Sequence, residues 1–130
     1  MVDVEVIAAT QVERPGDDEI ARLCRAACAR LGIAEGHIAV EFVDAQRIAE
    51  LNAGHRGKEG PTDVLSFPID GLEGQQGVPR ELGDIVICAA ETADIREAIV
   101  HGTLHLLGMD HESDDGEMLA LQDELMAEAR

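Results

Sequence analysis

Four short segments of the chain carry the apolar spacing of β-strands. VDVEVI alternates apolar and polar residues from Val2, and HIAVEFVD at residues 37–44 is mostly apolar. TDVLSFPID at residues 62–70 is expected to stop at Pro68, because proline donates no hydrogen bond to a sheet ladder. DIVICAA at residues 84–90 is apolar enough for a central strand. The chain is therefore expected to form a four-stranded sheet.

Two segments between these strands have the spacing of amphipathic helices. The first covers about residues 17–31, where acidic residues occupy the first turn and Asp17 or Asp18 is expected to be the cap. Gly32 follows as its stop signal. The second, AQRIAELNAGHRG, is expected to stop near Gly54.

The C-terminal third of the chain predicts two more helices. Residues from about 91 to 107 are apolar on almost every side, which is typical of a buried helix that ends at Gly108. SDDGEMLALQDELMAEA predicts a last helix with Ser113 as its N-cap. Residues 70–83 carry four glycines and a proline and are expected to form a mobile loop. The elements together predict a single α+β domain over residues 1–130, with a mixed four-stranded sheet packed with helices.

Composition excludes several classes of protein. With 130 residues, 45% of them apolar, the chain can bury a core and is too apolar for a disordered protein. No run of 18 apolar residues occurs, and the N-terminus has acids where a signal peptide has bases. These features predict a cytoplasmic protein with no membrane partner.

The charge balance counts against a simple nucleic-acid binder. Ten basic residues face 27 acidic ones, a formal net charge of −17. The chain also has no Trp or Tyr and only two Phe, so a base-stacking surface is hard to build. A function on RNA would have to overcome both facts.

The three cysteines have no framework spacing and do not indicate a secreted, disulfide-bonded protein. Cys24 and Cys28 lie one helical turn apart, which would fit half a metal site. They also share a helix stripe with Ile20 and Leu31, so burial in the core is the favoured interpretation. Cys88, at the end of an apolar strand, is interpreted in the same way.

HGTLHLLGMDH, residues 101–111, carries the strongest chemical signal. His101 and His105 lie one turn apart on the same face of a helix, and Gly108 lets the chain turn back so that His111 can approach. Three neutral imidazoles around one point, with a fourth position open, form the arrangement of a catalytic zinc site. Three unrelated histidines are the alternative, but the spacing favours one zinc ion (Zn²⁺) per chain, and so a metal site on a buried helix and the turn after it.

Two neighbours of these histidines bear on the reaction. Some zinc proteases with this spacing carry a glutamate directly after the first histidine as the general base, whereas this chain has Gly102. Cleavage of a phosphate ester depends more on stabilising negative charge, so the glycine favours a phosphate ester over a peptide. Asp110 is either a carboxylate that orients a histidine ring or a plain turn residue.

A second dense stretch, HRGKEGPTDVLSFP, covers residues 55–68. Arg56 and Lys58 stand close together in a chain with only ten basic residues, and arginine suits two-pronged recognition of phosphate. The alternative is a solvated turn with two ordinary surface cations, and this stretch alone leaves both interpretations open.

HRGKEGPTDVLSFP, LGDIVIC and HGTLHLLGMDH, in this order, resemble the signature motifs of the YbeY family of bacterial endoribonucleases and rRNA maturation factors. The resemblance implies an α+β domain that holds zinc through His101, His105 and His111. It implies cleavage of single-stranded RNA, in 16S rRNA 3′-end maturation and ribosome quality control. It also implies that Arg56 is catalytic, and Lys58 is then a candidate contact for the RNA.

The sequence departs from the family pattern in one place. Only CAAETADIREAIV separates the GDIVI strand from the first histidine, where the family usually has a longer stretch, so packing near residues 89–96 is expected to differ. To overcome the net negative charge, the chain would need a local basic rim or recruitment by the ribosome or a small-subunit assembly protein. The candidates for such a rim are Arg47, Arg56, Lys58 and Arg80.

Two other functions stay open on the sequence alone. One is a metallohydrolase on a substrate other than RNA, with peptides as the obvious case, although Gly102 counts against it. The other is a non-catalytic assembly factor that uses zinc only for stability. Three histidines and a water would favour catalysis, whereas a fourth protein ligand would favour a structural zinc.

Overall fold

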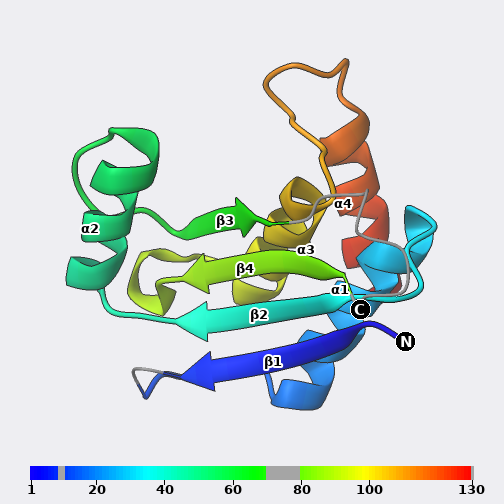
Figure 1. Cartoon of the computed structure of the whole chain (residues 1–130), viewed down its shortest axis with the longest axis horizontal. Helices are drawn as coiled ribbons and strands as arrows, with labels where there is room; N and C mark the ends of the chain where they lie inside the picture. Colours follow the sequence, from blue (N-terminus) through cyan, green and yellow to red (C-terminus); the bar gives the residue numbers. More distant parts are fainter. Residues whose placement is uncertain (9–10, 70–79, 130) are drawn as a thin grey trace.

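The computed structural model describes residues 1–8, 11–69 and 80–129, and the sheet runs through the middle of this part of the chain (Figure 1). The elements in chain order are β1 Asp3–Ala8, α1 Asp17–Arg30, β2 His37–Phe42, α2 Ala45–Arg56, β3 Val64–Pro68, β4 Glu81–Ile87, the short 3-10 helix η1 Ala89–Glu91, α3 Ile95–Leu106 and α4 Glu117–Ala129.

The sheet has four strands in the order β1-β2-β4-β3. β1, β2 and β4 run parallel, and β3 pairs antiparallel with β4 at one edge. The parallel pair β1–β2 is joined through α1, as parallel strands need a crossover connection. This arrangement confirms the predicted α+β fold with a mixed four-stranded sheet.

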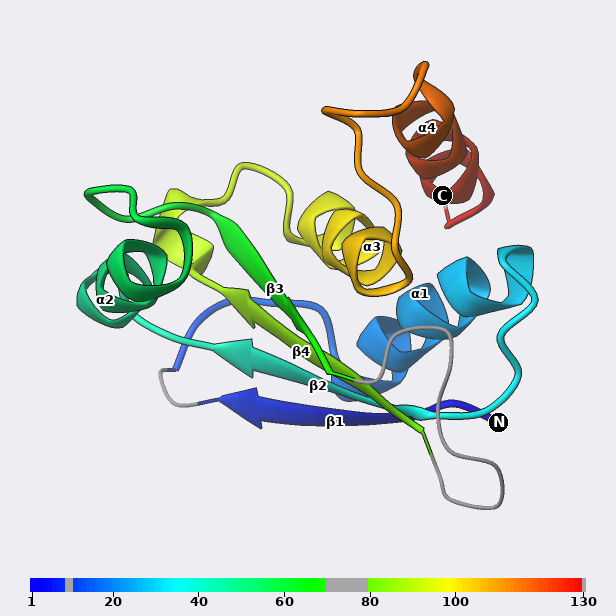
Figure 2. The same cartoon turned by 45° about the horizontal axis from the view of Figure 1, so that its top comes forward.

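α1 and α3 cover one face of the sheet, α4 packs on these two helices, and α2 lies at one end of the sheet (Figure 2). The main core joins α1, α3 and α4 to this face, and its largest fully buried side chains include Ile20, Phe42 and Ile99. A smaller cluster packs α2 against β3 and β4 through Ile48 and Leu65. Among the residues that the structure describes, no helix combines the length and apolar character needed to cross a membrane.

α3 approaches the sheet closely at Gly102. A Cβ atom added there would lie 2.7 Å from Cγ2 of Ile85 and 3.3 Å from Oγ of Ser66. The Ser66 hydroxyl also donates a hydrogen bond of 3.0 Å to the Gly102 carbonyl. Position 102 therefore faces β3 and β4, and a glutamate side chain has no room there.

One helix cap and one loop boundary differ from the sequence expectation. α1 begins at Asp17 as predicted, but it follows Gly16 with no side-chain cap, so neither Asp17 nor Asp18 caps it. The loop expected over residues 70–83 ends earlier than predicted, because Glu81 already begins β4 and pairs with β2. The rest of that expectation, residues 70–79, lies outside the described chain.

The two C-terminal helices begin later than predicted because aspartates upstream accept their first amides. α3 starts at Ile95, where Asp94 is the N-cap, and not near residue 91. The carboxylate of Asp114, and not the side chain of Ser113, accepts a hydrogen bond of 2.9 Å from the Met118 amide in the first turn of α4.

We predict that Gly102→Ala lowers the free energy of unfolding by about 1–3 kcal/mol, because the added methyl group forces α3 away from the sheet. Gly54→Ala is the matched control, since Gly54 is exposed, lies within α2 and has nothing within 4 Å of an added Cβ. The control should gain about 0.5–1 kcal/mol from helix propensity. Urea denaturation of both variants measures the difference, and equal stabilities would contradict the close contact.

Candidate functional site

α3 and the turn after it bring three histidines together. His101 and His105 stand one turn apart on α3, and Gly108 reverses the chain with a φ of 96° that other residues rarely adopt. His111 then lies beside them, with ring centroids 5.2 Å and 5.4 Å from the other two. One nitrogen from each ring falls within 4.8 Å of the others.

The Nδ1 atoms of the two helical histidines are already occupied. Nδ1 of His101 lies 2.7 Å from the side-chain oxygen of Gln122, and Nδ1 of His105 lies 2.9 Å from the Met109 carbonyl. Both partners are acceptors, so both Nδ1 atoms carry the proton in the neutral ring. The Nε2 atoms therefore present lone pairs, and they face each other at 3.2 Å.

Two facing lone pairs repel each other unless a cation lies between or beside them. Burial lowers the pKa of His105, and the neighbouring His101 shifts it in the same direction, so the His105 ring stays neutral near pH 7. Two nitrogens bound to one tetrahedral zinc would stand about 3.3 Å apart, from Zn–N bonds near 2.0–2.1 Å. The nitrogen pair therefore suits a shared metal ion.

The group of possible metal ligands is limited to three residues. Among the described His, Cys, Asp and Glu side chains, only His101, His105 and His111 form a group of this size and compactness. Cys24 and Cys28 lie in the core, where burial raises the pKa of the first thiol to about 12 and of the second to about 11. Neutral buried thiols are poor metal ligands, because the thiolate is the ligand form.

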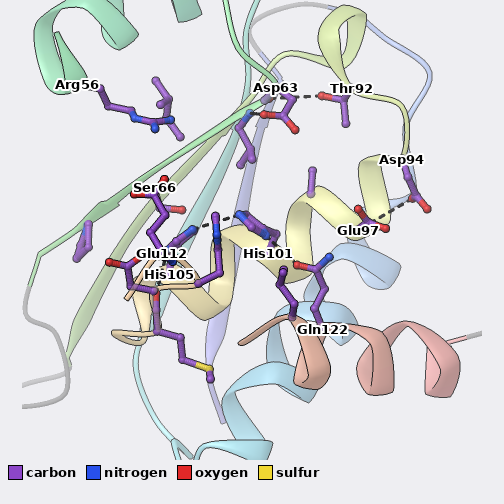
Figure 3. Close-up of a pocket in the computed structure, with 18 of the residues that line it drawn as sticks. Arg56, Asp63, Ser66, Thr92, Asp94, Glu97, His101, His105, Glu112 and Gln122 are labelled. Atoms are coloured by element: carbon purple, nitrogen blue, oxygen red, sulfur yellow. Dashed lines mark hydrogen bonds between the residues drawn. The ribbon is translucent and has the colours of Figure 1, made fainter. Parts of the chain in front are cut away.

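A cleft of about 930 Å³ opens above the histidines (Figure 3). Its walls come from the end of α2, from β3, from the segment that leads into α3 and from the turn after α3. Five acidic residues line it: Asp63, Asp94, Glu97, Asp110 and Glu112. Among the described residues that line the cleft, Arg56 is the one Lys or Arg side chain.

The length of α2 decides where Arg56 lies. The helix continues past Gly54, where it was expected to stop, and ends as Gly57 takes a left-handed conformation with φ of 67°. Arg56 is therefore the last helical residue, exposed, and it reaches into the cleft opposite the histidines (Figure 3). Lys58 is exposed and is not among the residues that line the cleft.

The basic rim expected from the sequence does not surround the cleft in the described part of the chain. Arg47 is paired with Glu50 at 3.4 Å on the surface of α2, and neither Arg47 nor Arg80 lines the cleft. The predicted rim is not found at this cleft, because only Arg56 of its four candidates lines it. The cleft therefore offers one guanidinium within an acidic rim.

Asp110 stabilises the turn after α3. Its carboxylate accepts a hydrogen bond of 3.0 Å from the Glu112 amide, which also lowers the pKa of Asp110. Within the described residues, no hydrogen bond joins this carboxylate to a histidine ring. The geometry gives the orienting role to Gln122 and to the Met109 carbonyl, and so favours the interpretation of Asp110 as a turn residue.

Sequence reasoning missed Gln122, although a signal was present. Gln122 is only 7% exposed and stands between Leu121 and Leu125 on the buried stripe of α4. A lone amide on an apolar stripe needs a hydrogen-bond partner, and the histidine helix is the element packed against α4.

Comparison with known proteins gives a consistent match. A family model described as Endoribonuclease YbeY matches residues 8–130. An Endoribonuclease YbeY of Micrococcus luteus is 40% identical, with 96% of this chain and 90% of the relative covered. One of Pseudomonas entomophila is 38% identical, with 98% of this chain and 89% of the relative covered.

The chain is also similar to a solved structure. The solution structure of TM1509 from Thermotoga maritima aligns with 99% of this chain and 89% of that chain, with a TM-score of 0.57 and 27% sequence identity. The alignment to the Micrococcus luteus relative spans 143 positions, more than the 130 residues of this chain. That relative therefore carries residues that this chain lacks.

We predict that Gln122→Met lowers zinc affinity by about 10–100-fold, as expected when the partner that orients a ligating histidine is lost. Gln122→Glu keeps an acceptor and should retain most of the affinity. Leu125→Met, which changes the packing of the same helix face, is the control. Affinity is measured by competition with a chromophoric chelator.

The tautomer of His101 can be measured in the same variants without any metal. Ring nitrogen chemical shifts of the metal-free protein should show His101 protonated on Nδ1 in the wild type and a mixture of tautomers in Gln122→Met. Folded Gln122→Met with unchanged tautomer and unchanged zinc affinity would show that Gln122 only fills space.

Proposed function

The chain belongs to the YbeY endoribonuclease family, and from this we propose that residues 1–130 form a single metallohydrolase domain, a zinc-dependent endoribonuclease specific for single-stranded RNA. Its expected task is maturation of the 16S rRNA 3′ end and ribosome quality control in the cytoplasm, with the ribosome or small-subunit assembly proteins as partners. The observation that carries the zinc site is the pair of facing Nε2 atoms, 3.2 Å apart.

In this proposal His101, His105 and His111 hold the metal. When bound, zinc supplies a nucleophile at neutral pH by lowering the pKa of water to about 7. The hydrogen bonds that the two helical rings donate from Nδ1 to Gln122 and to the Met109 carbonyl keep them in the tautomer that presents Nε2 to the cleft. These acceptors are a buried side-chain amide and a backbone carbonyl. The two rings should therefore keep their orientation when a substrate enters the cleft.

Arg56 is proposed to act on the phosphate. Attack on a phosphodiester builds negative charge on its nonbridging oxygens, and a guanidinium opposite the histidines can stabilise that charge in the transition state. The same group would also draw one phosphate of the RNA to the cleft. Lys58, exposed on the turn after α2, is proposed to contact the RNA outside the cleft.

The acidic rim supports a single-stranded substrate. A duplex presents two rows of phosphates, and five carboxylates around one arginine would repel most of them. A single strand can turn its bases away and offer one phosphate at a time. Because the cleft and the whole chain are acidic, we expect a protein partner, rather than long-range attraction to RNA, to bring the enzyme to the ribosome.

The two other functions left open by the sequence are not favoured. Position 102 faces the sheet, so it offers no place for the general base that a zinc protease carries there. A purely structural zinc would need a fourth protein ligand, and none joins the three histidines among the described residues.

We predict that Arg56→Ala lowers single-turnover cleavage of a short single-stranded RNA by about 10²-fold, as for loss of one preorganised charge-stabilising group. Arg56→Lys should restore little, because lysine lacks the planar fork. Zinc content and melting temperature should stay unchanged, since Arg56 is exposed and does not touch the histidines.

Two control variants separate the role of Arg56 from a general effect of surface charge and from loss of the metal. Arg47→Ala removes an exposed arginine of the same helix that does not line the cleft, and it should cleave at nearly the wild-type rate. His105→Ala should lose both zinc and cleavage. Cleavage by zinc-loaded Arg56→Ala at the wild-type rate would make Arg56 an ordinary surface cation, and absence of cleavage by the zinc-loaded wild type would contradict the proposed function.

A further inference from the structure

The residue before Arg56 packs its ring against an aromatic ring of β3 that is not itself among the residues lining the cleft. His55 is exposed on the last turn of α2 and lines the cleft. Its ring centroid lies 4.4 Å from that of Phe67 on β3, with an angle of 48° between the planes. Phe67 is half-buried and packs against the small core between α2 and the sheet, so it gives the His55 ring a fixed support.

Ring faces that a substrate can reach are scarce in this protein. The chain has no Trp or Tyr, and Phe42 is 0% exposed. His37 is held between two carboxylates on the strands, with Nδ1 2.5 Å from Glu81 and Nε2 3.3 Å from Glu5. The other three histidines form the cluster at the floor of the cleft. His55 is therefore the cleft-lining ring that is neither buried nor committed to another group.

We propose that His55, supported by Phe67, is a stacking surface for one unpaired base of the RNA, in the nucleotide whose phosphate lies on Arg56. This inference rests on the proposed function. His55 and Arg56 both line the cleft at the end of α2, so a single nucleotide can reach both with its base and its phosphate. Stacking on a ring tolerates any base, because every base has a π-face.

Stacking of a base on His55 would compensate for the weak attraction of RNA to an acidic cleft. With one guanidinium among five carboxylates, phosphate contacts alone hold RNA weakly. Stacking does not depend on net charge, and it selects unpaired bases because paired bases are already stacked. The His55–Phe67 pair thus adds a preference for single strands that Arg56 alone does not provide.

The test uses the zinc-loaded protein and a short single-stranded RNA with 2-aminopurine at one position at a time. Stacking quenches the fluorescence of this base, and stopped-flow mixing records the signal before cleavage. We expect quenching at one position, and an abasic nucleotide at that position should weaken binding by about tenfold. His55→Leu, which keeps apolar contact with Phe67 but has no ring, should lose the quenching and the sensitivity to the abasic site.

His55→Phe is the rescue variant, since it restores a ring and removes the imidazole nitrogens. It should regain most of the affinity for RNA and most of the quenching. In both His55 variants, the maximal cleavage rate should change less than the RNA concentration that gives the half-maximal rate. Equal quenching and equal abasic sensitivity in wild type and His55→Leu would overturn the stacking role. So would cleavage by a wild type that quenches at no position. Quenching without cleavage would instead overturn the proposed function.

Discussion

Two imidazole nitrogens, Nε2 of His101 and Nε2 of His105, face each other across 3.2 Å, and the rest of the site depends on this contact. Nδ1 of His105 donates to the Met109 carbonyl in the turn after α3, so that ring cannot change tautomer without losing this hydrogen bond. Nδ1 of His101 donates to the side-chain oxygen of Gln122 on α4, so that ring can change tautomer only if the Gln122 amide turns to present its NH2 group. The packing of α4 on α3 and the left-handed turn at Gly108 therefore serve the same purpose, which is to hold two lone pairs ready for a cation.

The contact of α3 with the sheet explains why a zinc-protease spacing lacks the protease glutamate. In a zinc protease with this spacing, the residue after the first histidine reaches the metal site. Here it turns onto β3 and β4, where Ile85 and Ser66 leave no space for a side chain. The close packing of α3 on the sheet therefore leaves no room for a glutamate at this position. Stabilisation of negative charge on the substrate is then the proposed role of Arg56, a residue of α2.

The sequence predicted those parts of the structure that follow from local spacing. The strands and the two histidines one helical turn apart follow from local spacing, and Gly108 marks the turn that brings the third histidine back. The partners of the histidine rings could not be predicted in the same way, because Gln122 is 21 residues from His101 and meets it only through helix packing. The predicted basic rim was wrong for the same reason, since the packing of the elements decides which basic side chains line the cleft. The pairing of His55 with Phe67 likewise requires α2 to run on to Arg56 and to lie against β3.

A crystal structure of the zinc-loaded protein would show directly how the three histidines hold the metal. We predict one zinc ion about 2.0–2.1 Å from Nε2 of His101, Nε2 of His105 and a ring nitrogen of His111, with a water in the fourth position. Nδ1 of His101 should remain bonded to Gln122. A fourth protein ligand, or a zinc bound through Nδ1 with the Gln122 contact broken, would contradict it.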